Sequence, residues 1–167
     1  GVQEPGGGRG GAGVGRGTAA SNRGTLDGVW PARGERRLDL GFGGGTLIER
    51  ALAEHPGVRV VGADPSEDMV ARLAEHLAPD IASGRLELVV ASAEALPLPD
   101  GALDCLTSVY TVYFWPDAAR GLAEVRRVLR PGGRVALAVT PPGLQRAIGF
   151  DREGFSVRSG ADVAALM

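Results

Sequence analysis

Four glycines stand together between two apolar segments of the chain. They belong to residues 41–45 (GFGGG), which follow the short apolar run 38–40 (LDL), and an amphipathic run begins at Thr46. This order predicts a strand, a glycine turn and a helix. Glycine suits such a turn because the backbone must reverse within a few residues, and without a Cβ a ligand can lie directly on the main chain. The spacing therefore indicates a site for a small-molecule cofactor.

An acidic residue ends the next buried segment, residues 58–64 (VRVVGAD), and a proline follows it. Two interpretations of Asp64 remain open. Its side chain is a suitable cap for the helix that follows, with Pro65 at the first helical position. The carboxylate is equally suited to accept hydrogen bonds from a ligand at the carboxyl end of the strand.

Half of the aromatic side chains lie in one short stretch. Residues 110–115 (YTVYFW) hold four of the eight aromatic residues and come directly after the apolar run 103–109. These rings either line a ligand pocket or pack between the sheet and the next helix. The sequence leaves both open.

The elements that must position these residues alternate along the chain. We expect strands over 38–40, 58–64, 86–90, 103–109 and 135–139, with helices from 46, after 65 and 117, and over 161–167. Each strand is a nearly continuous apolar run, which is typical of a parallel sheet covered on both faces. Right-handed crossovers then give a doubly wound α/β fold with its ligand crevice at the carboxyl ends of the strands.

Composition and charge narrow the function classes. The 167 residues suffice for one domain, and a formal net charge of -2 makes neither a nucleic acid nor an anionic membrane an expected partner. No apolar run is long enough for a transmembrane helix, and the start lacks the pattern of a secretion signal. We therefore expect a cytoplasmic protein without membrane insertion.

The ionisable residues exclude several kinds of site. The single cysteine, Cys105, is predicted to be a small buried residue, and both histidines lie near helix ends, so neither a metal site nor a histidine-based triad is expected. All 18 basic residues are arginine, which excludes a Walker phosphate loop.

The composition predicts two parts. Residues 1–20 are a Gly/Arg-rich segment that we expect to be flexible, because it has almost no apolar surface to bury. The tract has no aromatic residues, so no RNA partner is expected. Residues 21–167 form the domain, beginning with a helix predicted over 21–30.

The motifs resemble those of the class I S-adenosylmethionine-dependent methyltransferases over residues 36–140. Residues 38–45 are similar to the family's first motif, and residues 61–66 (VGADPS), followed by Met69, to its second. Two further segments resemble the regions around the fourth and fifth strands: 94–104 (EALPLPDGALD) and 124–134 (EVRRVLRPGGR). The dinucleotide fingerprint fails because Thr46 stands where its third glycine should be.

The resemblance implies a role for each motif. Asp39 would orient the glycine loop or the amino group of S-adenosylmethionine, Asp64 would accept hydrogen bonds from both ribose hydroxyls, and the loop 92–94 would contact the adenine. The implied cofactor-binding residues are Asp39, Gly41, Phe42, Gly43, Gly45, Asp64, Pro65, Met69, Ser92, Ala93, Glu94 and Val109. The candidates facing the methyl acceptor are Tyr110, Tyr113 and Trp115.

The implied activity is methyl transfer to a small-molecule or lipid-like acceptor by in-line displacement. No catalytic residue is assigned, because alignment and exclusion of water are the main tasks and a base is needed only if the acceptor must lose a proton. The resemblance also implies a Rossmann-like fold without the family's usual C-terminal strand pair. Two alternatives stay open: an inactive or truncated S-adenosylmethionine-binding domain, and an NAD-dependent oxidoreductase.

Overall fold

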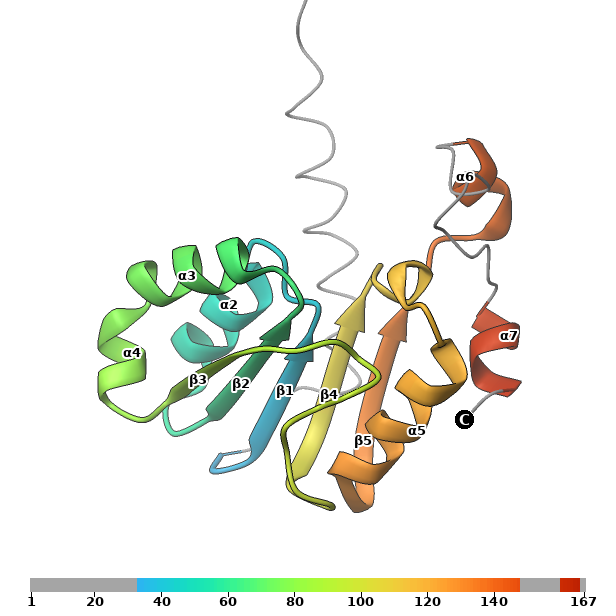
Figure 1. Ribbon diagram of the computed structural model, residues 1–167. Helices are drawn as coiled ribbons and strands as arrows, with labels where there is room; N and C mark the ends of the chain where they lie inside the picture. Colours follow the sequence, from blue (N-terminus) through green and yellow to red (C-terminus); the bar gives the residue numbers. More distant parts are fainter. Residues whose placement is uncertain (1–32, 148–159, 166–167) are drawn as a thin grey trace, which may run out of the picture.

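Five parallel strands form a single sheet in the order β3-β2-β1-β4-β5 (Figure 1). The computed structural model describes residues 33–147 and 160–165. Within these ranges every ladder of the sheet is parallel. The strands are β1 (Arg36–Leu40), β2 (Arg59–Asp64), β3 (Leu86–Val90), β4 (Leu103–Val109) and β5 (Leu129–Ala138). The predicted parallel α/β sheet is confirmed.

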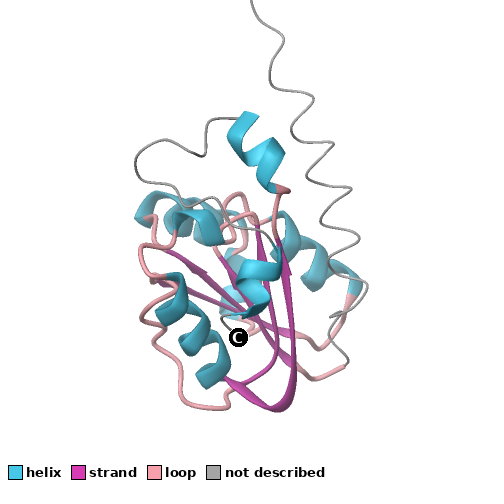
Figure 2. Cartoon of the chain, turned by 90° about the vertical axis from the view of Figure 1, so that its right-hand side faces the viewer, coloured by secondary structure: helices cyan, strands magenta, loops and turns pink. Residues whose placement is uncertain are grey.

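Helices cover both faces of this sheet, which is seen edge-on between them in Figure 2. The helical elements are α2 (Thr46–Glu54), α3 (Glu67–His76), α4 (Ala78–Ala82), the 3₁₀ turn η1 (Val112–Phe114), α5 (Ala118–Val128), α6 (Pro142–Ala147) and α7 (Gly160–Ala165). Within the described residues, no helix has the length and apolar character needed to cross a membrane.

Two apolar clusters show which helix covers which face. Ile48 of α2 and Leu73 of α3 cluster with Val60 of β2. Leu122 of α5 clusters with Leu38 of β1, on the opposite face. Because α2 and α3 share one face and α5 lies on the other, the chain winds outward from β1 in both directions. The carboxyl ends of β1 and β4 therefore form the switch point at which such folds bind ligands.

The last strand begins earlier than the sequence predicts. The sequence predicts a strand over 135–139, whereas β5 begins directly after α5, at Leu129, and includes residues 130–133 (RPGG). Leu103 pairs with Leu129, but Cys105 pairs with Arg134, so the register shifts between the two pairs. A bulge of this kind accommodates proline and glycine inside a strand, which composition alone does not reveal.

The remaining differences concern helices: the structure has two that the sequence analysis does not predict, and two predicted segments cannot be compared. Helices α4 and α6 were not predicted, while α7 agrees with the helix expected over 161–167 as far as residue 165. The flexible segment 1–20 and the helix over 21–30 lie outside the described residues.

Candidate functional site

The glycine loop between β1 and α2 reaches the switch point. Gly41 and Gly43 both have positive φ angles, 72° and 51°. A Cβ on Gly41 would lie 2.5 Å from the side chain of Thr111, whereas one on Gly43 would meet nothing within 4 Å. Gly41 is thus required for the close approach of the loop to Thr111, and Gly43 is where the loop presents open main chain.

Gly45 has a different task from the other two. It is the residue before α2, with φ 80°, and a Cβ there would lie 2.4 Å from the side chain of Leu73. Its lack of a side chain allows α2 and α3 to pack closely. No side chain caps the first turn of α2 at Gly45, so backbone N–H groups of that turn are left for a ligand.

Asp64 fixes the loop from the end of β2. Its Oδ2 accepts the N–H of Gly43 at 3.0 Å, and its Oδ1 accepts the N–H of Ser66 at 2.9 Å. The helix-cap interpretation of Asp64 is wrong: Ser66 caps α3, which begins at Glu67, and its hydroxyl accepts the N–H of Met69 at 3.3 Å. Each carboxylate oxygen of Asp64 retains a lone pair, so the buried side chain can still accept hydroxyl groups.

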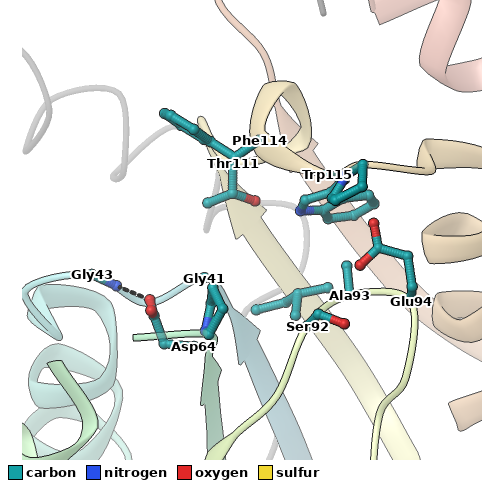
Figure 3. A pocket seen from close by; sticks show the side chains of 12 residues that line it. Gly41, Gly43, Asp64, Ser92, Ala93, Glu94, Thr111, Phe114 and Trp115 are labelled. Atoms are coloured by element: carbon teal, nitrogen blue, oxygen red, sulfur yellow. Dashed lines mark hydrogen bonds between the residues drawn. The ribbon is translucent and has the colours of Figure 1, made fainter. Parts of the chain in front are cut away.

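A cavity of about 490 Å³ opens above this carboxylate. Figure 3 shows Asp64 and Gly43 on one side of it and Trp115 with Glu94 on the other. The lining residues are Leu40, Gly41, Gly43, Asp64, Pro65, Ser92, Ala93, Glu94, Thr111, Phe114, Trp115 and Pro116. We call this space the nucleoside cavity.

A second cavity of about 250 Å³ shares Gly41 and Gly43 with the first. Its lining residues are Asp39, Gly41, Phe42, Gly43, Gly44, Thr46, Leu47, Val109 and Tyr110. Because the start of α2 and a buried carboxylate both face this space, it offers complementary groups to the two charges of an amino acid. We call it the amino-acid cavity.

Asp39 provides the carboxylate of the amino-acid cavity. Its Oδ1 accepts the hydroxyl of Thr107 at 3.1 Å, and its Oδ2 has no hydrogen-bond partner among the described residues. Burial raises the pKa of Asp39, and the charge of Arg37 and the Thr107 hydrogen bond act in the opposite direction. A buried, unsatisfied oxygen at a cavity wall is a binding group for a hydrogen-bond donor.

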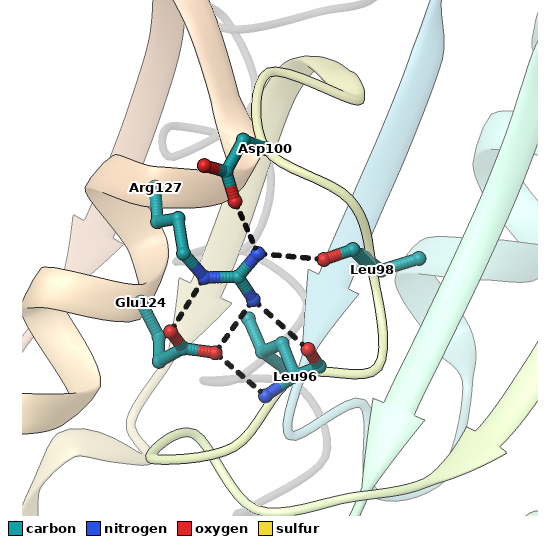
Figure 4. A network of polar contacts seen from close by, with 5 residues as sticks. All are labelled: Leu96, Leu98, Asp100, Glu124 and Arg127. Atoms are coloured by element: carbon teal, nitrogen blue, oxygen red, sulfur yellow. Dashed lines mark hydrogen bonds and ion pairs between the residues drawn. The ribbon is translucent and has the colours of Figure 1, made fainter.

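The loop that forms the floor of the nucleoside cavity is tied to α5. Arg127 donates to the carbonyls of Leu96 and Leu98 and pairs with Asp100 and Glu124, while Glu124 also accepts the N–H of Leu96 (Figure 4). This network holds a loop that has no regular structure of its own. It thereby fixes Ser92, Ala93 and Glu94, which precede it.

Most of the predicted site residues line one of the two cavities, although their contact with a cofactor stays a prediction. These are Asp39, Gly41, Phe42, Gly43, Asp64, Pro65, Ser92, Ala93, Glu94, Val109, Tyr110 and Trp115. Three do not line either cavity. They are Gly45, described above, and Met69 and Tyr113.

Tyr113 and Met69 lie elsewhere for separate reasons. Tyr113 is 1% exposed in the core between the sheet and α5, and its hydroxyl accepts the N–H of Thr140. Met69 is 38% exposed and lines a separate surface depression beside Gly43 and Arg72.

The prediction missed several lining residues. Thr111, Phe114 and Pro116 lie in or beside the aromatic run, and Tyr110 has the positive φ angle, 59°, that turns the chain there. The aromatic run was the available signal, but which of its side chains face the cavity depends on this turn and on η1.

Comparison with known proteins identifies the family. A family model described as a methyltransferase domain matches residues 38–137. The chain belongs to the class I S-adenosylmethionine-dependent methyltransferases. The match includes the glycine loop, Asp39, Asp64 and the segments 94–104 and 124–134, and the cofactor of this family is S-adenosylmethionine.

The relatives agree with this assignment. The chain is 40% identical over 127 residues to a ubiquinone/menaquinone biosynthesis C-methyltransferase UbiE of Methylobacterium nodulans, covering 73% of this chain and 49% of the relative. It is 37% identical to the UbiE protein of Geobacter sulfurreducens, covering 64% of this chain and 42% of the relative. The chain thus spans less than half the length of these relatives.

A solved structure carries the same fold. An S-adenosylmethionine-dependent methyltransferase from Mesorhizobium loti superposes with a TM-score of 0.61 at 32% identity, covering 74% of this chain and 53% of that one. These matches support the methyltransferase interpretation over the NAD-dependent alternative.

The residues of the two cavities fit S-adenosylmethionine. Asp64 and the open backbone at Gly43 are suited to its nucleoside, and the unpartnered Oδ2 of Asp39 with the uncapped start of α2 to its amino-acid end. The cavities meet at the glycine loop, as one continuous ligand requires.

Proposed function

We propose that this chain transfers a methyl group from S-adenosylmethionine to a ring carbon of a small, apolar hydroxylated aromatic acceptor. The observation that carries the proposal is the junction of the two cavities at Gly41 and Gly43. One cavity has a buried carboxylate for an ammonium group, and the other has a carboxylate for hydroxyls and a wall of aromatic rings.

The nucleoside side is built to orient the cofactor. Asp64 would hold the ribose with both oxygens, since the N–H groups of Gly43 and Ser66 fix the carboxylate in one orientation. Glu94 accepts the N–H of Asp117 at 3.1 Å, which holds the adenine-contacting loop beside α5. The cofactor supplies an electrophilic methyl group when bound, and these residues set the direction in which it points.

The acceptor would share the nucleoside cavity with the cofactor and lie against its aromatic wall. Trp115 is 7% exposed and Phe114 is 53% exposed, so one ring closes the cavity and the other lies at its edge. Flat apolar side chains favour a flat apolar acceptor and exclude water from the transfer. The relatives' names support a quinone-type acceptor, because they are C-methyltransferases of ubiquinone and menaquinone biosynthesis.

The carboxylates of the nucleoside cavity are stabilised as anions by backbone N–H groups, which makes them weak bases. Asp64 and Glu94 both accept backbone N–H groups. A ring carbon made electron-rich by a neighbouring hydroxyl can take the methyl group as the S–CH3 bond breaks and S-adenosylhomocysteine leaves, and the ring proton is released to water only afterwards, so no strong enzymic base is required before the transfer. We therefore favour such a carbon over an alcohol or an amide.

The test is methyl transfer to a demethylated naphthoquinol, with the product located by mass spectrometry and NMR. We expect one added methyl group on a ring carbon, and a Trp115→Ala variant with several-fold lower kcat/KM. Methylation of an oxygen instead, or no transfer by a protein that binds S-adenosylhomocysteine, would overturn the acceptor assignment and leave the cofactor assignment intact.

A further inference from the structure

A fully buried arginine lies on β1 two residues before Asp39. Arg37 is 0% exposed, and its side chain is on the same face of the sheet as Asp39 because residues two apart on a strand share a face. A guanidinium in a sheet core is costly unless it is paired and hydrogen-bonded. None of the sequence motifs assigns this arginine a role.

A chain of hydrogen bonds joins Arg37 to Asp39 through the neighbouring strand. Nη2 of Arg37 donates to the hydroxyl oxygen of Thr107 at 2.7 Å, and that hydroxyl donates to Oδ1 of Asp39 at 3.1 Å. Thr107 lies directly opposite Asp39 in the β1/β4 ladder. Strand register therefore fixes the three groups. The hydroxyl oxygen of Thr107 accepts from the arginine, and for its single proton Oδ1 of Asp39, at 3.1 Å, is a nearer acceptor than the carbonyl of Leu38, at 3.5 Å.

These hydrogen bonds engage only one oxygen of Asp39, which lines the amino-acid cavity. Oδ1 is occupied by Thr107, while Oδ2 has no hydrogen-bond partner among the described residues, and Asp39 lines the cavity. A carboxylate with one fixed oxygen cannot rotate freely. Its second oxygen is buried and has no hydrogen-bond partner among the described residues, so it favours a cationic donor at this wall of the cavity.

The charges around Asp39 determine whether it is ionised. Burial raises its pKa and so does Asp64 at the end of β2, while Arg37 lowers it. Cys105 of β4 lies opposite Arg37 in the ladder, and its pKa is raised to about 11, so it is a neutral thiol. Tyr110, after β4, is the other titratable side chain that lines the cavity within the described residues. Arg37 is thus the cation that favours the anionic form of Asp39.

We infer that Arg37 and Thr107 are positioning residues for cofactor binding: they hold Asp39 as an oriented carboxylate whose Oδ2 receives the ammonium group of S-adenosylmethionine. The inference rests on the proposed function, because it takes the amino-acid cavity to hold that end of the cofactor. Neither side chain has to touch the cofactor. Each acts through Asp39.

Two ligands separate this role from a purely structural one. S-adenosylhomocysteine carries the ammonium group, whereas 5′-methylthioadenosine has the same nucleoside without the amino-acid end. Calorimetric titration of both ligands should show that Arg37→Met weakens S-adenosylhomocysteine about tenfold or more and leaves 5′-methylthioadenosine within about twofold, because only a charge-assisted hydrogen bond is lost.

A matched control lies on the same strand. Arg36→Met removes an arginine whose side chain is 30% exposed and pairs with Glu87, and it should change neither affinity. Thr107→Val, which keeps the shape but removes the hydroxyl, should reproduce the Arg37→Met pattern, and Thr107→Ser should restore binding. If Arg37→Met does not fold, the Thr107 pair decides the question alone.

Each outcome has one meaning. Loss of S-adenosylhomocysteine affinity alone supports the inference. An equal loss for both ligands, or no change for either, overturns it and makes Arg37 a structural residue. Failure of the unaltered protein to bind either ligand would instead overturn the proposed function.

Discussion

Asp39 lies one residue before the end of β1 and Asp64 ends the neighbouring strand β2, and they line joined cavities, yet their surroundings differ. Asp64 is held by the backbone N–H groups of Gly43 and Ser66, so its orientation does not depend on another side chain. Asp39 is held by a side chain, Thr107, with a buried arginine behind it. The orientation of Asp64 is thus set by nearby backbone, whereas that of Asp39 depends on side chains in the interior of the sheet. A change at Asp39 should therefore affect folding and binding together, and a change at Asp64 mainly binding.

The largest expected effect is a loss of stability when the carboxylate of Asp39 in β1 is removed. Asp39→Ala removes the carboxylate whose charge acts on the buried Arg37, and removing one member of a buried charge pair costs about 3 to 5 kcal/mol in other proteins. We expect the free energy of unfolding, measured in urea, to fall by about 3 kcal/mol. Asp68→Ala on the exposed side of α3 is the control. A loss no larger than that of the control would contradict a charged pair in the core.

The next effect is on ligand affinity, and it differs between the two carboxylates. Asp64→Ala should weaken both S-adenosylhomocysteine and 5′-methylthioadenosine about tenfold or more, because both ligands carry the ribose whose hydroxyls it would accept. Asp39→Asn should weaken only the first of them. Titration calorimetry gives both ratios. Unchanged binding of 5′-methylthioadenosine to the Asp64 variant would remove Asp64 from the ribose site.

A third variant tests the aromatic wall of the nucleoside cavity, which lies across from Asp64. A Cβ on Gly121 of α5 would lie 2.7 Å from the ring of Trp115, so Gly121→Ala should push the indole toward the nucleoside cavity. We expect a several-fold higher KM for the acceptor and a stability loss of about 1 to 3 kcal/mol from overpacking. If stability falls but the KM stays the same, Trp115 does not bound the acceptor site.

The smallest effect concerns the network that ties the loop after Glu94 to α5. The hydrogen bond from Arg127 lowers the pKa of Glu124 below its ordinary 4.5, so Glu124 stabilises the fold when ionised. This contribution is complete above pH 4.5 and is lost as the pH falls through the lowered value. Glu124→Gln should therefore lose less stability than the unaltered protein between pH 6 and pH 3, by about 1 kcal/mol or less. An equal loss of stability in the two proteins over this pH range would contradict this.

The local parts of the site were readable from the sequence. The glycine loop and the acid at the end of β2 depend on residues close together in the chain, and the apolar runs of β3 and β4 match the predicted strands. The role of Arg37 could not be read, because its partner Thr107 is 70 residues away and the pairing depends on strand register.

The aromatic run shows a second limit. Tyr113 and Phe114 are neighbours in one short turn, yet the first is 1% exposed in the core and the second is 53% exposed at the cavity edge. A short 3₁₀ turn after a residue with positive φ has no periodicity that a sequence reveals. The same holds for the cap of α3, where Ser66 rather than Asp64 accepts the helix N–H, since either residue type serves as a cap.

A crystal structure with S-adenosylhomocysteine tests the central claim most directly. We predict that the two ribose hydroxyls lie within hydrogen-bond distance of the Asp64 carboxylate and that the ammonium group lies on Oδ2 of Asp39, with the chain between them crossing Gly43. A nucleoside bound outside the cavity above Asp64, or an amino group turned away from Asp39, would contradict the account.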